Sequence, residues 1–223
     1  MRETIREYKW TLLITAVIIL LPILPGMYFW DRLPEQVATH WGVHGEPNGW
    51  SSRGFAVFGL PLFLLAMQAL CLVMDKYNVH ARQNRKIMLL ILWIIPVISL
   101  FCGVSVYGYA LGYDVQVQTM APVLVGVLFM LVGNYLPKCR QNRTVGIKIP
   151  WTLGSEANWT ATHRFAGKLW VAAGVVMLVC VFLPEKVMGW VLLPVILGVV
   201  LVPTVYSYLY SSRNRQTGEE EDA

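Results

Sequence analysis

The longest polar interruption of this chain is residues 133–168, which read G-N-Y-L-P-K-C-R-Q-N-R-T-V-G-I-K-I-P-W-T-L-G-S-E-A-N-W-T-A-T-H-R-F-A-G-K. The segment carries six cations but only one acid, Glu156. An apolar run of membrane-spanning length precedes it, and a slightly shorter one follows. Basic side chains beside spanning helices favour the headgroup region of the bilayer. We therefore expect this segment to lie against one membrane face.

The composition points to the membrane. Of the 223 residues, 56% are hydrophobic and only 14% are charged, which is unlike an ordinary soluble domain. Nine Trp and ten Tyr suit two interfacial aromatic belts. The net charge is +5, and the Lys and Arg residues lie beside apolar runs. Membrane topology and contact with anionic lipid therefore explain this charge better than binding of nucleic acid does. We expect no direct nucleic-acid partner and no cofactor.

The apolar runs predict an all-α integral membrane protein with six transmembrane helices. The expected spans are residues 10–30, 55–74, 88–110, 118–136, 169–184 and 187–210. Pro22 and Pro25 should kink the first span, which is too long for a signal peptide and should remain as an anchor. The fifth span should continue a helix that begins near Ser155. Close helix contacts are expected at small residues, namely Gly103, Gly108, Gly126, Gly133, Gly174 and Gly198.

The loops predict how the chain is oriented in the membrane and how it divides into modules. Fifteen of the 18 Lys and Arg residues fall in the N-terminal arm, the loop 75–87, the loop 133–168 and the tail. The positive-inside rule then places both termini and the loop 133–168 in the cytoplasm, and the loop 31–54 outside. We expect one membrane module at 1–110, a second at 111–210 and a disordered polar tail at 211–223.

The loop 133–168 has readable local chemistry. Pro137 should end the preceding helix, and Gly146 permits a tight turn. Pro150 should force the residue before it out of helical geometry. Gly154 or Ser155 can cap a new helix, on which Trp159 and His163 share one face. Trp151 and Trp159 suit the interface, where an indole N–H stays wet, and His163 is better explained as bonded to the loop than as a proton shuttle.

These residues resemble the signature of the SdpI-type bacterial immunity family. The resemblance is carried by Gly133-Asn134-Tyr135-Leu136-Pro137-Lys138, Asn142, Gly146-Ile147-Lys148, Pro150-Trp151-Thr152-Leu153, Ser155-Glu156, Trp159 and Thr162-His163-Arg164. It implies a membrane protein of the bacterial cell that protects against a secreted peptide toxin and, with toxin bound, holds a cytoplasmic repressor protein at the membrane. Lys148 departs from the usual Arg, and Lys offers only a point charge where Arg offers a bidentate contact. The cytoplasmic site suggested is Asn134, Lys138, Arg140, Asn142, Arg143, Lys148, Trp151, Glu156, Trp159, His163 and Arg164.

The outer loop 31–54 carries a second resemblance. It reads D-R-L-P-E-Q-V-A-T-H-W-G-V-H-G-E-P-N-G-W-S-S-R-G, with dense turn chemistry at residues 45–49. Its residues resemble a short domain of unknown function that often precedes the immunity signature, although Gly42 replaces the usual Asn. We expect a compact, toxin-facing loop whose candidate residues are His40, Trp41, His44, Glu46, Asn48 and Trp50.

The same loop leaves an alternative open. His40 and His44 are four residues apart with Glu46 nearby, so a membrane-embedded metal-dependent enzyme is a second hypothesis. Gly42 and Gly45 argue against a helix there, and Trp41 stands where a metalloprotease needs Glu. We therefore favour a non-enzyme without a metal, in which these residues pack the loop onto the helix ends. The spans hold no ionisable residue in their central portions, which disfavours a proton-coupled transporter.

Overall fold

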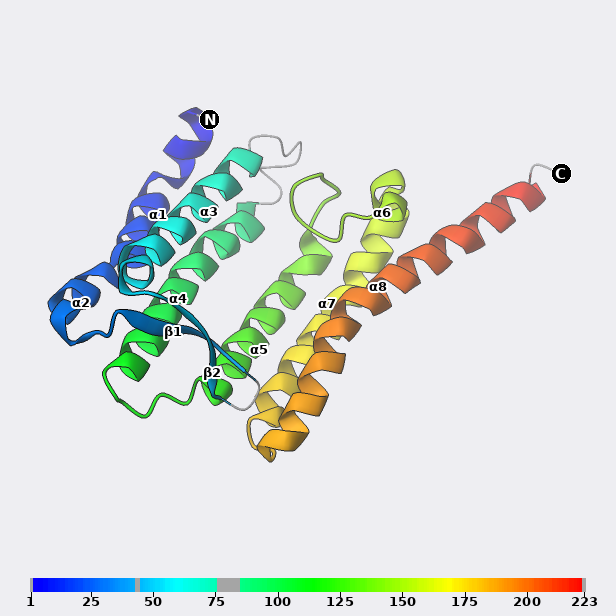
Figure 1. The fold of residues 1–223 in the computed structure, drawn as a ribbon. Helices are drawn as coiled ribbons and strands as arrows, with labels where there is room; N and C mark the ends of the chain where they lie inside the picture. The colour runs from blue at the N-terminus through cyan, green and yellow to red at the C-terminus, as the bar shows by residue number, and fades with distance from the viewer. Residues whose placement is uncertain (1, 43–44, 76–84, 222–223) are drawn as a thin grey trace. The chain divides into compact units, whose positions relative to one another are not determined.

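The computed structural model describes residues 2–42, 45–75 and 85–221, with side chains described for 8–42, 45–75, 85–184 and 187–214. The elements follow one another as α1 (Arg2–Leu20), α2 (Ile23–Tyr28), η1 (Trp30–Arg32), β1 (Gln36–Trp41), β2 (Pro47–Ser52), η2 (Phe55–Gly59), α3 (Leu60–Asp75), α4 (Arg85–Ala110), α5 (Val117–Tyr135), η3 (Leu136–Lys138), α6 (Pro150–Gly154), α7 (Glu156–Cys180) and α8 (Glu185–Glu221) (Figure 1). The described residues fall into two compact units, one within Met1–Lys76 and Met88–Ala121, the other within Tyr77–Ile87 and Pro122–Ala223.

Six helical segments of the described chain are long and apolar enough to cross a membrane, which confirms the predicted class. They are Tyr8–Tyr28, Phe55–Asp75, Arg85–Ala110, Val117–Lys138, Glu156–Cys180 and Val187–Asn214. The fifth begins directly after Ser155, as expected, but the helix ends at Cys180 rather than near residue 184. At Leu21 and Pro22 a turn separates α1 from α2, which confirms the predicted break.

In the first unit, polar side chains join helices within the apolar region. The Gln68 amide on α3 donates a 2.8 Å hydrogen bond to Thr15 Oγ1 on α1, and both residues are buried. On α4, the Ser99 hydroxyl donates to the Ile19 carbonyl of α1 at 2.8 Å. Such bonds satisfy polar groups that lipid would leave without partners.

The second unit depends on a close crossing of α5 and α7. A Cβ atom added at Gly126 would lie 2.9 Å from the Gly174 carbonyl oxygen, and one at Gly133 would lie 2.8 Å from that of Gly167. Only glycine lets the two backbones approach this far. The prediction of close packing is therefore confirmed at Gly126, Gly133 and Gly174.

Of the other glycines predicted to make close helix contacts, two do so and one does not. A Cβ at Gly103 would meet Pro22, and one at Gly108 would meet Val115, so both make close contacts. Gly198 has no neighbour within 4 Å of such a Cβ, and there the prediction is wrong.

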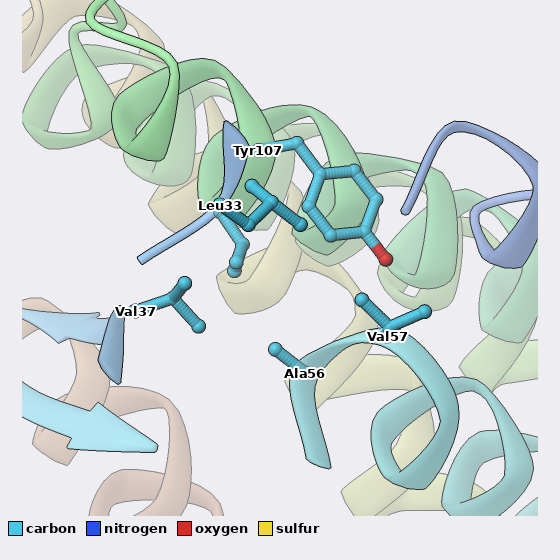
Figure 2. Packing of buried hydrophobic residues seen from close by; sticks show 6 residues of the cluster. Leu33, Val37, Ala56, Val57 and Tyr107 are labelled. Atoms are coloured by element: carbon cyan, nitrogen blue, oxygen red, sulfur yellow. The ribbon is translucent and has the colours of Figure 1, made fainter. Parts of the chain in front are cut away.

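The outer loop contains a β-hairpin that the sequence did not predict. Strands β1 and β2 pair antiparallel, with a register shift on either side of His40 (Figure 1). The hairpin rests on a buried apolar cluster, which we call the hairpin seat: Leu33, Val37, Ala56, Val57, Val106 and Tyr107. Figure 2 shows five of these side chains directed toward one another from the end of η1, from β1, from η2 and from α4. The seat anchors the strands to the ends of the spanning helices of their unit.

The chain end also differs from expectation. Helix α8 continues to Glu221, through residues that we expected to form a disordered tail after residue 210. Extending an existing helix avoids the nucleation cost that an isolated polar segment would face.

Candidate functional site

The loop between α5 and α7, which we call the signature loop (residues 136–155), begins where the sequence predicted. Helix α5 ends at Tyr135, and Pro137 lies in the short 3₁₀ turn η3. Before Pro150, Ile149 is extended, with φ −120° and ψ 159°. The Ser155 hydroxyl accepts the backbone N–H of Asn158 and so caps α7. The loop is thus fixed at both ends by the predicted residues.

The middle of the loop is closed over a stacked pair of rings on α7. Trp159 and His163 stack with centroids 4.0 Å apart and planes at 19°. Gly146 crosses directly above them with φ +119°, and a Cβ there would lie 2.6 Å from His163 Nε2 and 2.9 Å from the indole. Both the backbone conformation and the lack of space therefore require glycine at this position.

Hydrogen bonds define the protonation state of His163. Its Nδ1 is 2.8 Å from the Trp159 carbonyl oxygen, which can only accept, so Nδ1 carries the proton. The backbone N–H of Ile147 donates to Nε2 at 3.0 Å, so Nε2 carries none. The buried imidazole is therefore neutral and ties the loop to the helix, as predicted.

Trp159 corrects one expectation. Its side chain is 1% exposed, and its indole N–H donates to the Cys139 carbonyl at 2.8 Å rather than to water. Trp159 is therefore an internal strut of the signature loop and not an interfacial anchor. Trp151 is half-buried and packs edge-on against Tyr208 of α8, with centroids 5.2 Å apart.

Asn142 holds the turn that follows η3. Its amide donates to the carbonyls of Arg140 (2.7 Å) and Val145 (3.0 Å), and its Oδ1 accepts the backbone N–H groups of Thr144 and Val145, both at 2.7 Å. This buried side chain satisfies four backbone groups that would otherwise lack partners. Asn142 therefore locks this turn through the backbone.

Cys139, beside Asn142, also takes part through its thiol in the polar contacts of this turn. Its buried thiol lies 3.5 Å from both the Asn142 amide and the Val145 carbonyl. Burial raises the pKa of this thiol to about 11, although the bond from Asn142 opposes the shift.

Two further polar residues, which were not among the candidate site residues, close the loop. The Thr152 hydroxyl accepts the N–H of Ile149 and donates to the Ile147 carbonyl at 2.7 Å. The Gln141 amide donates to the carbonyls of Thr152 (2.8 Å) and Leu153 (3.1 Å), which tie the first half of the loop to α6. The composition of the loop indicated turns that polar side chains could close. It did not indicate which backbone groups Thr152 and Gln141 would bond.

A polar contact between α7 and α8 was also missed. Asn158 donates to the Ser207 carbonyl at 2.9 Å, and its Oδ1 accepts from the hydroxyls of Ser207 (2.7 Å) and Thr162 (2.9 Å). All three side chains are buried. The sequence features that could have indicated this contact are Asn158 and Thr162, one turn apart on α7, and Ser207 in the last apolar run.

The charged candidates lie outside this neutral framework. All are exposed, and so is Asn134 at the end of α5: Lys138, Arg140, Arg143, Lys148, Glu156 and Arg164. Lys138 lies over the Tyr135 ring at 4.9 Å, and Lys148 donates to the Thr144 carbonyl. The loop therefore presents exposed cations around a scaffold whose buried hydrogen bonds are made by neutral side chains and the backbone.

The outer hairpin is built differently. His40 Nδ1 is hydrogen-bonded to Asn48 Oδ1 across the strands, and Trp50 is 55% exposed. Trp41 is half-buried and packs edge-on against Tyr109, with centroids 5.9 Å apart. The hairpin thus brings His40 and Asn48 together, while it separates Trp50 on the surface from Trp41 against α4.

Arg53 fastens the end of the hairpin. Its guanidinium donates to the carbonyls of Trp30 (2.7 Å) and Leu33 (3.0 Å) and lies 4.5 Å from the Trp30 ring centroid. These contacts add to the apolar seat beneath the strands.

The metal hypothesis receives no support from this geometry. His40 lies on a strand and bonds to Asn48, Glu46 is exposed, and His44 lies outside the described residues. Among the residues that the structure describes, no group of three or more His, Cys, Asp and Glu is placed to hold a metal ion.

Comparison with known proteins matches both regions. The sequence model of the SdpI/YfhL protein family matches residues 138–207, which hold most of the signature loop with α7 and much of α8. A domain of unknown function, DUF1648, matches residues 17–65 and so includes the hairpin. Immunity protein SdpI of Bacillus subtilis (strain 168) is 25% identical over 199 residues, which are 89% of this chain and 94% of that protein. The chain is similar to the SdpI/YfhL family over residues 138–207. It is a multi-pass protein of the bacterial cell membrane. No solved structure matches it.

Proposed function

We propose that this chain is a member of the SdpI/YfhL family and an immunity protein that protects its cell against a secreted peptide toxin. The observation that carries the proposal is the match to Immunity protein SdpI over nearly the whole of both chains. The two modules also occur in the order that the family resemblance implies, with the DUF1648 region first.

The toxin-facing surface in this proposal is the hairpin, with its loop outside the cell. Trp50 is the exposed aromatic side chain of β2, and His40 and Asn48 lie exposed beside it. Exposed aromatic residues on a rigid support are common anchors for peptide ligands. Trp41 instead supports the hairpin from below, so we assign it no direct contact.

The signature loop is the cytoplasmic readout in this proposal. Exposed Arg140, Arg143 and Arg164 would meet an acidic surface of a repressor protein. The neutral network beneath them favours a fixed presentation of these charges, because buried hydrogen bonds of His163 and Trp159 hold the loop on α7.

Survival of a gene-deletion strain tests the proposal. The strain carries wild-type protein, Trp50→Ala, or Tyr28→Ala at equal expression, and is exposed to the peptides that its parent secretes. Tyr28 is 82% exposed on α2 and lies off the hairpin, which makes it a matched control. We expect wild type and Tyr28→Ala to protect and Trp50→Ala to fail. A deletion strain that survives as well as its parent would overturn the immunity function, while full protection by Trp50→Ala would overturn only the hairpin assignment.

A further inference from the structure

A polar pocket of about 340 Å³ lies between η3 and the first turns of α7, within the second unit. Lys138, Arg140 and Arg164 line it, with Glu156 as the acid present. Trp159 forms part of its wall, and because the indole N–H is already bonded to Cys139, it offers the pocket an apolar ring surface. The pocket thus combines an excess of positive charge with one flat apolar wall.

The exposed stripe of α7 places this pocket near the membrane surface. Glu156, Thr160, Arg164 and Lys168 follow one another at intervals of four residues, and all are exposed. Charged side chains avoid hydrocarbon, and a lysine that starts within the apolar zone can extend its ammonium toward the headgroups. The pocket lies at the Glu156 end of this stripe, and we therefore place it at the depth of the lipid headgroups.

We propose that this pocket binds the phosphate group of an anionic phospholipid. The Arg164 guanidinium and the Lys138 ammonium supply charge-assisted donors for phosphate oxygens, and the Thr160 hydroxyl supplies a neutral one. A zwitterionic headgroup carries its own cation and gains less from this surplus of positive charge. The pocket shares Arg140 and Arg164 with the proposed repressor-facing surface, but its binding of lipid can be tested without the toxin or a repressor.

Thermal unfolding of the purified full chain in a neutral detergent tests the site. Short-chain phosphatidylglycerol, short-chain phosphatidylcholine and free glycerol phosphate are added in separate titrations, and the rise in Tm gives the apparent affinity. The variants are Lys138→Gln with Arg164→Gln, Glu156→Gln, and Lys168→Gln as the control. Lys168 has the same charge on the same face of α7, but it does not line the pocket.

We expect wild type and Lys168→Gln to bind phosphatidylglycerol at least tenfold more tightly than phosphatidylcholine, and the double variant to lose that preference. Glu156→Gln should tighten binding of phosphatidylglycerol, a gain that misfolding cannot produce. Equal binding of the two lipids by wild type, or an equal loss in Lys168→Gln, would overturn the proposal. Free glycerol phosphate that binds as tightly as phosphatidylglycerol would overturn the assignment to lipid.

Discussion

The hairpin and the signature loop are the two large polar segments that the structure describes, and they are held by opposite means. The hairpin rests on an apolar cluster built around Leu33, Val37 and Val57, with Arg53 as a polar clasp. The signature loop closes on a neutral polar network in which His163 and Asn142 bond to the backbone. An apolar cluster fixes where a hairpin packs, whereas a hydrogen-bonded loop fixes its own backbone path. Substitutions should therefore affect one segment and spare the other.

The largest effect is expected in the signature loop, from Gly146→Ala. The new methyl group would meet His163 and Trp159, and alanine is strained at φ +119°. The two effects together should cost about 3–5 kcal/mol in unfolding free energy. Unfolding in detergent, with hydrogen exchange of residues 139–149 as the local measure, checks this. Gly154→Ala is the matched control, because a Cβ there meets nothing within 4 Å. Equal losses in the two variants would contradict the assigned role of Gly146.

A smaller effect is expected in the hairpin seat, from Leu33→Ala. Removing this buried side chain should cost about 2–3 kcal/mol and speed hydrogen exchange in β1 and β2. Exchange in the signature loop should stay as in wild type. Leu62→Ala, at a position 52% exposed on α3, should change little. If Leu33→Ala loosened both segments alike, the two would not be separately supported.

The smallest effect concerns the reactivity of Cys139 and its dependence on pH. Because burial raises the pKa of this thiol to about 11 from 9.0, its thiolate at pH 8 should be about 100-fold scarcer than that of a free cysteine. Folded protein should then react slowly with a maleimide at this site, and SDS-unfolded protein at the ordinary rate. The thiol should destabilise the fold only as the pH rises from about 9 through 11. Mass spectrometry of the labelled peptide gives both rates, and equally fast labelling in the folded protein would place the thiol outside the network.

Local chemistry made much of the signature loop predictable. The helix stop at Pro137, the turn at Gly146, the extended Ile149, the cap at Ser155 and the shared face of Trp159 and His163 each depend on a few neighbouring residues. The six spans were predictable for the same reason, since length and apolar composition are local properties.

What escaped prediction depends on distant partners. The burial of Trp159 requires the Cys139 carbonyl, 20 residues away, and Asn158 requires Ser207, 49 residues away. The hairpin was hidden because its register shifts around His40 break the alternation of a regular strand pair. Its apolar seat draws on α4 and η2, which no pattern within residues 31–54 reveals.

The central claim is that the hairpin and the signature loop lie on opposite sides of the membrane, and cysteine labelling in whole cells tests it most directly. Trp50→Cys and Arg143→Cys place a thiol at exposed positions of the two segments, and wild type reports the background of the four native cysteines. A membrane-impermeant maleimide should label Trp50→Cys in intact cells and Arg143→Cys only after the cells are permeabilised. Labelling of both variants in intact cells, or of neither, would contradict the account.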